Sequence, residues 1–309
     1  MKQLLFVFIW LTAMSASAQS LDDLMEAETE EETTDKQETT FVENHFLGTR
    51  VINLPTTELT RKGMLDFRIS HRFGELKSGA SDLWGIDRAQ IRFNLEYGFT
   101  DNLVVGLARS SYRKTYEGYF KYRFARQQEE GFPLTLAFYG NTGVWSEEDF
   151  DFQDGLGGFG EEEYVFTDRL TYTFQLIASR KFGKNFSAQL NPSLVQFAID
   201  TRDRDRQAYA LGGGVRYKLS PRFALTSEYV YLLNRENLPL VDGQEARNSF
   251  SIGMDIETGG HNFQLHITNS IPQTAAGYIA QTTETWGDGG IRFGFNIKRS
   301  FTIVKPKAR

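Results

Sequence analysis

The fold is decided by two stretches of sequence, residues 64–73 (MLDFRISHRF) and residues 88–97 (RAQIRFNLEY). In both stretches apolar side chains occupy every second position, and polar or charged side chains occupy the positions between them. Phe67 and Ile69, for example, flank Arg68. Because successive side chains of a strand point to opposite faces of a sheet, this pattern predicts strands with one apolar and one charged face. Such strands cannot be buried in an apolar core on both faces.

The same alternation continues along the chain and predicts about twelve strands in all. The further strands are expected near residues 103–109, 116–124, 133–145, 166–182, 186–198, 207–219, 222–233, 248–257, 262–270 and 290–301. Short joints rich in Gly, Pro, Asn and Asp, the residues of tight turns, alternate with longer polar joints. An even strand number and alternating short and long joints are typical of an outer-membrane barrel.

A closed barrel is also the way in which strands can cross a bilayer, because every backbone N–H and C=O group in hydrocarbon needs a partner within the protein. Beyond residue 11, no apolar stretch approaches the roughly 20 residues of a membrane-spanning helix. The expected fold is therefore all-β, an antiparallel transmembrane β-barrel of about 12 strands with short periplasmic turns and longer extracellular loops.

Aromatic residues favour a membrane barrel over a soluble β-sandwich, whose strands alternate in the same way. They gather where strands meet joints: Tyr97, Phe99, Phe124, Phe132, Phe182, Phe186 and Phe223 toward one end, and Tyr112, Trp145, Tyr164 and Tyr231 toward the other. Two such girdles border the outward apolar band of a barrel. In the sandwich, the alternative, the same residues are core aromatics.

The N-terminus is expected to be removed during export. Lys2, the apolar run from Leu4 to Leu11 and the small residues Ala16 to Ala18 form a signal peptide over residues 1–18, cleaved after Ala18. Residues 19–40 hold nine acidic side chains against Lys36 and are expected to be a disordered acidic tail. Residues 41–309 then form the outer-membrane barrel of a Gram-negative bacterium. The tail is either a solvated spacer or a docking peptide for a periplasmic protein.

Four stretches resemble a family of outer-membrane β-barrel proteins that is known as a domain of unknown function. They are residues 106–123 (GLARSSYRKTYEGYFKYR), 176–183 (LIASRKFG), 260–270 (GHNFQLHITNS) and 290–301, which contains RFGFNIKRSF. The resemblance covers about residues 41–301. It implies a barrel in the outer membrane, and it carries over no activity and no catalytic residues.

If the apolar positions face lipid, the charged positions of the first four strands face the lumen of the barrel, because charge is costly on the lipid face. These are Asp66, Arg68, Arg72, Arg88, Arg92, Glu96, Glu117, Lys121 and Arg123. Six are basic and three acidic. Later strands add Arg216, Lys218 and Arg292 to the basic side and Glu228, Asp255 and Glu257 to the acidic side. The set is either a cross-linked network that fills the lumen or a basic wall that guides anions.

No pattern of residues indicates catalysis, a metal or a cofactor. The four His lack metal-site spacing, and there is no G-x-S-x-G nucleophile motif. His266 and Ser270 share one strand face but are about 13 Å apart, too far to pair. The acidic loop over residues 147–163 could take a cation but lacks the ligand order of an EF-hand. Gly212 to Gly214 indicate a bend or close packing within the barrel, and no basic surface predicts nucleic-acid binding.

We therefore expect a barrel that is not an enzyme and needs no cofactor. Its partners would be outer-membrane lipid and the barrel-assembly machinery. The first hypothesis is a conduit for small polar or anionic solutes. The alternative is a non-conducting structural or docking barrel that recruits a periplasmic partner through its acidic tail. A conduit needs continuous water in the lumen, whereas the alternative needs the lumen to be filled.

Overall fold

The computed structural model describes residues 40–147, 166–198 and 204–305. The predicted signal peptide and the predicted tail, apart from Thr40, lie outside the described residues. Residues 40–309 belong to one compact unit.

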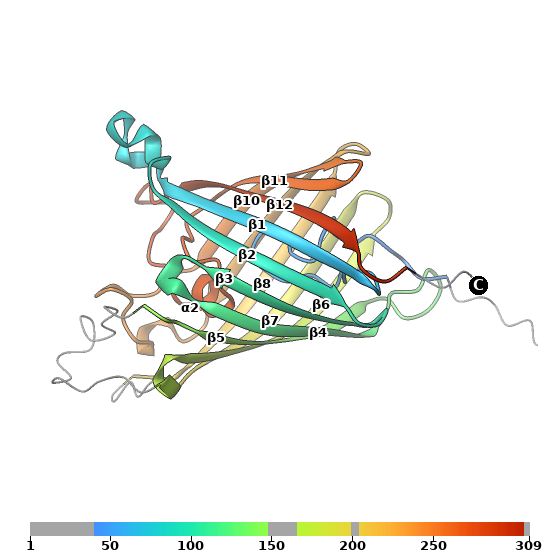
Figure 1. Cartoon of the computed structure of the whole chain (residues 1–309), viewed down its shortest axis with the longest axis horizontal. Coiled ribbons are helices and arrows are strands. Elements are labelled where there is room, and N and C mark those ends of the chain that lie inside the picture. Colours follow the sequence, from blue (N-terminus) through green and yellow to red (C-terminus); the bar gives the residue numbers. More distant parts are fainter. Residues whose placement is uncertain (1–39, 148–165, 199–203, 306–309) are drawn as a thin grey trace, which may run out of the picture. The chain divides into compact units, whose positions relative to one another are not determined.

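Twelve strands among the described residues close into one antiparallel barrel, in which each strand pairs with its neighbours in sequence and β1 pairs with β12 (Figure 1). The strands are β1 (Met64–Glu75), β2 (Ala89–Gly98), β3 (Leu103–Ser110), β4 (Tyr116–Ala125), β5 (Thr135–Val144), β6 (Leu170–Phe182), β7 (Phe186–Phe197), β8 (Gln207–Lys218), β9 (Phe223–Leu232), β10 (Ser249–Thr258), β11 (His261–Thr268) and β12 (Arg292–Thr302). The closure leaves no free sheet edge, which removes the unpaired backbone groups that hydrocarbon would not tolerate.

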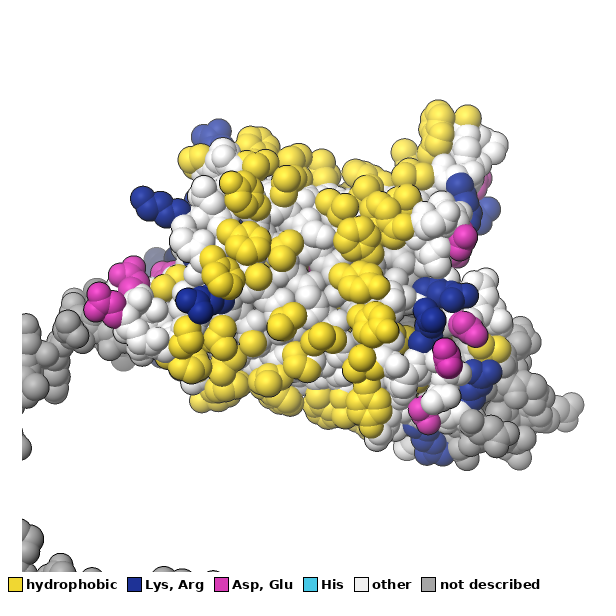
Figure 2. All heavy atoms as spheres, turned by 180° about the vertical axis from the view of Figure 1, so that it is seen from behind, with side chains coloured by type: hydrophobic (Ala, Val, Ile, Leu, Met, Phe, Trp, Pro, Cys, Tyr) yellow, Lys and Arg dark blue, Asp and Glu magenta, His cyan; other side chains and the backbone are white. Residues whose placement is uncertain are grey.

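The barrel is apolar outside and polar inside. Along β1 the buried positions are Asp66, Arg68, Ser70 and Arg72, whereas the apolar residues between them face outward. The outward side chains of the other strands include Leu107, which is 65% exposed, and Leu190, which is 55% exposed. Figure 2 shows apolar side chains over the middle of the barrel wall, with Lys, Arg, Asp and Glu at its two ends. This pattern is the reverse of a soluble protein and fits a surrounding of lipid.

The joints differ between the two ends of the barrel. At one end, here called the short-turn end, tight turns such as 183–185 and 219–222 join the strands, and β1 begins and β12 ends there. At the other, the long-loop end, the joints include η1 (Leu76–Ser78), η2 (Ala80–Gly85), η3 (Tyr112–Lys114), η5 (Phe166–Arg169), η6 (Arg235–Asn237) and the helix α2 (Ala275–Ala280). Within the described ranges, no helix has the length and apolarity to cross a membrane.

The strand prediction is confirmed in number, order and pairing direction. Each predicted boundary lies within two residues of the observed one except the start of β6, which is preceded by the short helix η5. Of the predicted aromatic girdles, Phe99 and Tyr231 are exposed, and Tyr164 lies outside the described residues. Trp145 was wrongly expected to face outward. It is buried, and the Arg169 guanidinium lies 5.1 Å from the centre of its ring.

We predict that a charge on the outward face of the barrel destabilises it according to depth. Leu190→Arg, in the body of β7, should lower the free energy of unfolding by about 2–4 kcal/mol, because Arg is costly at the middle of a bilayer. Leu233→Arg, just beyond the end of β9, should cost about 0–1 kcal/mol. Urea unfolding in lipid vesicles, followed by tryptophan fluorescence, measures both. Equal losses for the two variants would contradict an outward face that is embedded in lipid.

Candidate functional site

The lumen is occupied by the chain that precedes β1. We call residues 45–60 the plug. Its apolar side chains Phe46, Val51, Ile52 and Leu54 are each at most 2% exposed. The plug forms a tight turn in which the Val51 N–H donates to the Leu54 carbonyl at 2.8 Å and the Thr56 N–H to the Thr49 carbonyl at 3.0 Å. In Figure 1 this segment is the blue trace among the strands.

One wall carboxylate holds the tip of the plug. The backbone N–H groups of Ile52, Asn53 and Leu54 all donate to Glu228 on β9, at 2.9 to 3.0 Å, and the Asn53 side-chain amide donates to it at 2.8 Å. Hydrogen bonds to an ionised acceptor are stronger than neutral ones. Successive N–H groups that converge in this way form a concave site for an anion, and the wall supplies that anion.

Basic residues of the wall bind the carbonyl side of the plug. The Lys121 ammonium donates to the carbonyls of Thr49, at 3.3 Å, and Glu58. The Arg72 guanidinium donates to Asn53 Oδ1 at 2.9 Å. The wall thus offers a carboxylate to the N–H groups of the plug and basic groups to its carbonyl oxygens.

A side-chain contact between His45 and the wall fixes the start of the plug. His45 Nδ1 lies 2.8 Å from Ser179 Oγ on β6, which lies 2.6 Å from Thr57 Oγ1. Burial lowers the pKa of His45 to about 4, so the ring is neutral at physiological pH. Ser179 is fully buried, and it is not among the residues that line the cavities described below. The contact therefore attaches the plug and gives no sign of a reactive serine.

Two glycines of β8 make room for the plug. A Cβ atom on Gly212 would lie 2.9 Å from Leu54 Cδ2, and one on Gly214 would lie 2.9 Å from Val51 Cγ2. The glycine run over residues 212–214 thus gives close packing, as the sequence indicated. At Gly212 and Gly214 the close neighbours are the plug and the adjoining strand β7, from which Asn191 and Gln189 approach to 3.2 Å.

The long-loop end is closed by a different segment. Helix α2, between β11 and β12, is fully buried and packs against β5 to β9. Gln175 Nε2 on β6 donates to the Tyr278 hydroxyl at 2.7 Å, and the Ala275 N–H donates to Glu117 Oε1 at 2.8 Å. Apolar residues of the wall such as Ile177 and Val195 belong to the same buried cluster as α2. The plug and α2 together leave the lumen filled.

The structure brings seven of the nine predicted lumen residues together inside the barrel: Asp66, Arg68, Arg72, Arg92, Glu96, Glu117 and Lys121 are all buried. Arg92 and Glu117 form an ion pair at 2.7 Å with both side chains 1% exposed. Glu96 accepts from Tyr119 and from Thr60 of the plug. Part of the network therefore binds the plug and does not fill the lumen by itself.

The other two predicted lumen residues lie elsewhere. Arg88 was wrongly assigned to the lumen: it precedes β2, its side chain is 78% exposed, and it pairs with Asp82 at the long-loop end. Arg123 is half-buried at the short-turn end, where its guanidinium donates to the Asp101 carbonyl at 2.8 Å. The alternation of apolar and polar residues begins one residue before β2 does, at Arg88. Alternation alone does not show where a strand begins.

The charge of the central lumen is also different from the sequence expectation. The buried charged residues of the strands are Arg68, Arg72, Arg92, Lys121 and Arg292 on the basic side and Asp66, Glu96, Glu117, Glu228 and Asp255 on the acidic side. The two signs balance once all strands are counted. Among the described residues of the first four strands, for which the excess was predicted, four buried basic side chains stand against three acidic ones, and the later strands cancel this difference.

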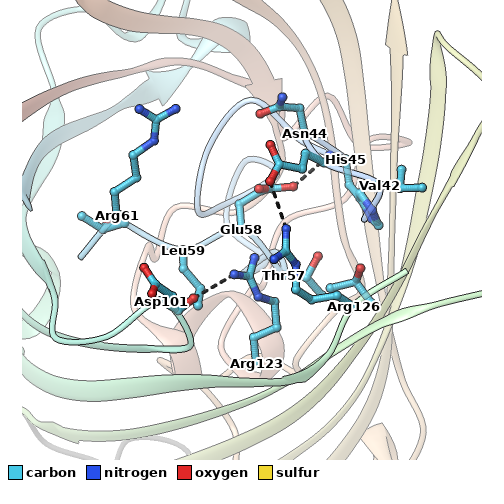
Figure 3. Close-up of a pocket in the computed structure, with 13 residues that line it drawn as sticks. Val42, Asn44, His45, Thr57, Glu58, Leu59, Arg61, Asp101, Arg123 and Arg126 are labelled. Carbon is cyan, nitrogen blue, oxygen red and sulfur yellow. Dashed lines mark hydrogen bonds and ion pairs between the residues drawn. The ribbon is translucent and has the colours of Figure 1, made fainter. Parts of the chain in front are cut away.

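A cavity of about 260 Å³ opens beside the plug at the short-turn end (Figure 3). The Glu58 carboxylate in it accepts from the His45 N–H at 2.8 Å, and Arg126 pairs with Glu43 at 3.0 Å. Burial raises the pKa of Glu58. Arg61 stands apart from these pairs in Figure 3. The cavity is a polar mouth whose inner wall is the plug.

Nothing in the described part of the chain indicates a metal centre. No group of three His, Asp or Glu side chains there is arranged to hold an ion. The acidic loop over residues 147–163, apart from Glu147, lies outside the described residues. Ser270 donates to the Pro272 carbonyl at 3.1 Å and has no contact with His266.

The chain belongs to a family of membrane-bound β-barrel domains, DUF5777, whose model matches residues 46–301. The match includes most of the plug as well as the barrel. No curated protein matches the sequence.

Among solved structures, the NanC porin is 10% identical with a TM-score of 0.48, covering 77% of this chain and 98% of that one. The KdgM porin is 10% identical with a TM-score of 0.43, covering 77% and 99%. An outer-membrane channel from Pseudomonas putida F1 is 12% identical with a TM-score of 0.44, covering 79% and 97%. These likenesses concern the barrel fold alone.

We predict that Glu228→Gln loosens the plug. The glutamine amide keeps one oxygen but places an N–H donor against the backbone N–H groups of the plug. This should lower the stability of the bound plug by about 1–3 kcal/mol. Hydrogen exchange of the peptide over residues 50–56 should then accelerate roughly tenfold or more. Glu257→Gln, the same change at an exposed position of β10, is the control and should leave exchange unchanged. Unaltered exchange in Glu228→Gln would contradict the role of this carboxylate.

Proposed function

We propose that the protein is an outer-membrane conduit for small polar solutes, anions among them, which its own N-terminal plug closes from the periplasmic side. The observation that carries this proposal is the burial of residues 45–60 inside a polar-walled lumen. Outer-membrane barrels place their short turns in the periplasm. The short-turn end, where the plug enters, is accordingly the periplasmic end.

The chemistry of the wall supports a lumen that can hold water. Behind the plug the wall presents amides and hydroxyls as well as charges, among them Gln189 and Asn191 on β7, which donate to the Pro55 carbonyl at 3.0 Å. A wall of this kind can exchange hydrogen bonds with the plug for hydrogen bonds with water. A barrel meant to stay closed would be stabilised as well by apolar wall residues, because buried ion pairs add little stability over apolar packing.

A second candidate function is favoured by the closure at the long-loop end. Because α2 is anchored on apolar wall residues, it keeps the lumen closed there even when the plug leaves. In that case the protein is a non-conducting docking barrel. A periplasmic protein that binds residues 19–40 would hold the chain that leads directly into the plug. Neither candidate includes an enzymatic activity.

We predict that conduction depends on plug release. Thr57→Cys with Ser179→Cys should form a disulfide between plug and wall, because the two Oγ atoms are 2.6 Å apart and an S–S bond is about 2.05 Å long. The chain contains no other Cys. In planar bilayers the oxidised variant should be silent. After reduction it should show the rare openings of the unmodified mature protein, and Glu228→Gln should open more often.

The results for the disulfide variant and for Glu228→Gln together distinguish the conduit from the docking barrel. Each variant is first shown to be a folded barrel by heat-modifiable migration on a gel. Openings that the disulfide does not suppress would contradict closure by the plug. Silence of folded Glu228→Gln, despite faster exchange of the plug amides, would exclude the conduit and leave the docking barrel.

A further inference from the structure

A second cavity at the short-turn end differs from the first in its charge. It has a volume of about 560 Å³ and lies on the other side of residues 58–61, which line both cavities. Its basic residues are Arg61, Lys181, Lys184, Arg216, Lys218 and Lys298, and its acidic residues are Glu58, Asp66 and Glu257. The cavity, which we call the basic vestibule, therefore has a formal excess of three positive charges.

The partners of these residues show where the excess lies. Asp66 is already bound by Lys298 at 3.1 Å, and Arg216 pairs with Asp255 at 3.5 Å. Glu58 accepts from two backbone N–H groups of the plug. Among the described residues, Arg61, Lys184 and Lys218 have no ion-pair partner.

Like charges are also held close together on the wall. Lys181 on β6 lines the same cavity as Arg216 and Lys218 on β8. A protein gains nothing in stability from such repulsion, which a bound anion would relieve. The basic groups come from the three wall strands β6, β8 and β12, from the turn 183–185 between β6 and β7, and, through Arg61, from the chain directly after the plug.

We propose that the basic vestibule binds a small soluble polyanion, bearing at least two phosphate or carboxylate groups, between Lys184 of the turn, Lys218 of β8 and Arg61. Lysine and arginine are the usual partners of such groups. The volume admits a small molecule. The ligand is soluble and not a lipid headgroup because the cavity lies inside the barrel wall, away from the outward apolar band. The site belongs to the plugged barrel, whose plug residues line it, and it does not depend on conduction.

Calorimetric titration of tripolyphosphate into the refolded mature protein in neutral detergent tests the site. We expect one ligand per chain at low salt and loss of binding in about 1 M salt, where the Debye length shrinks to about 3 Å. Lys184→Gln with Lys218→Gln should weaken binding about tenfold or more, because two charge-assisted contacts are lost. Both positions are at the surface of the mouth, so the barrel fold should be retained.

The control is Lys62→Gln with Arg299→Gln, which removes the same charge at the same end from exposed residues that do not line the cavity. It should bind as the unmodified protein does. Equal loss in the two double variants, or no binding at low salt, would overturn the proposal. Competition by phosphatidylglycerol added to the micelles would overturn the assignment to a soluble ligand.

Discussion

The structure depends on one constraint, which is that backbone groups in hydrocarbon must find their partners within the protein. Closing twelve strands into a barrel satisfies those groups, but it turns a polar face inward around a lumen. The lumen must then be hydrated or filled. Here the chain fills it with its own plug and with α2, and the wall charges that would otherwise need water find partners there.

The plug is held in a way that suits reversible contact. A buried carboxylate or ammonium group without partners costs several kcal/mol, so Glu228 and Lys121 each favour the plugged state strongly. Water can offer the same hydrogen bonds to both groups when it enters. The free-energy difference between the plugged and the water-filled lumen is therefore smaller than the number of plug contacts suggests, because each hydrogen bond to the plug replaces one to water. The apolar side chains of α2 and of the plug, among them Phe46, Val51 and Leu54, belong to one buried cluster, whose packing water cannot replace.

The strands could be predicted from sequence because alternation is a local property that each strand carries alone. The plug could not. Residues 45–60 show no clear period, and their partners lie far away: Glu228 is about 175 residues from the backbone groups that it binds. Alternation assigned Glu228 to the lumen, and the glycines 212–214 indicated close packing. No neighbouring residue in the sequence identified the plug as their partner. The basic vestibule was missed for the same reason, because Lys181, Lys184 and Lys218 meet only when β6 and β8 close around the plug.

The distance along the chain between the plug and the wall residues that bind it also limits the order of folding. The plug is synthesised first, but its wall partners extend from Arg72 on β1 to Glu228 on β9, so its site is complete only when most of the barrel exists. Contacts at such separation are made late, because loop closure must precede them. The strands must therefore pair without help from the plug, as their alternation allows. The plug is therefore a segment that the barrel does not need in order to form.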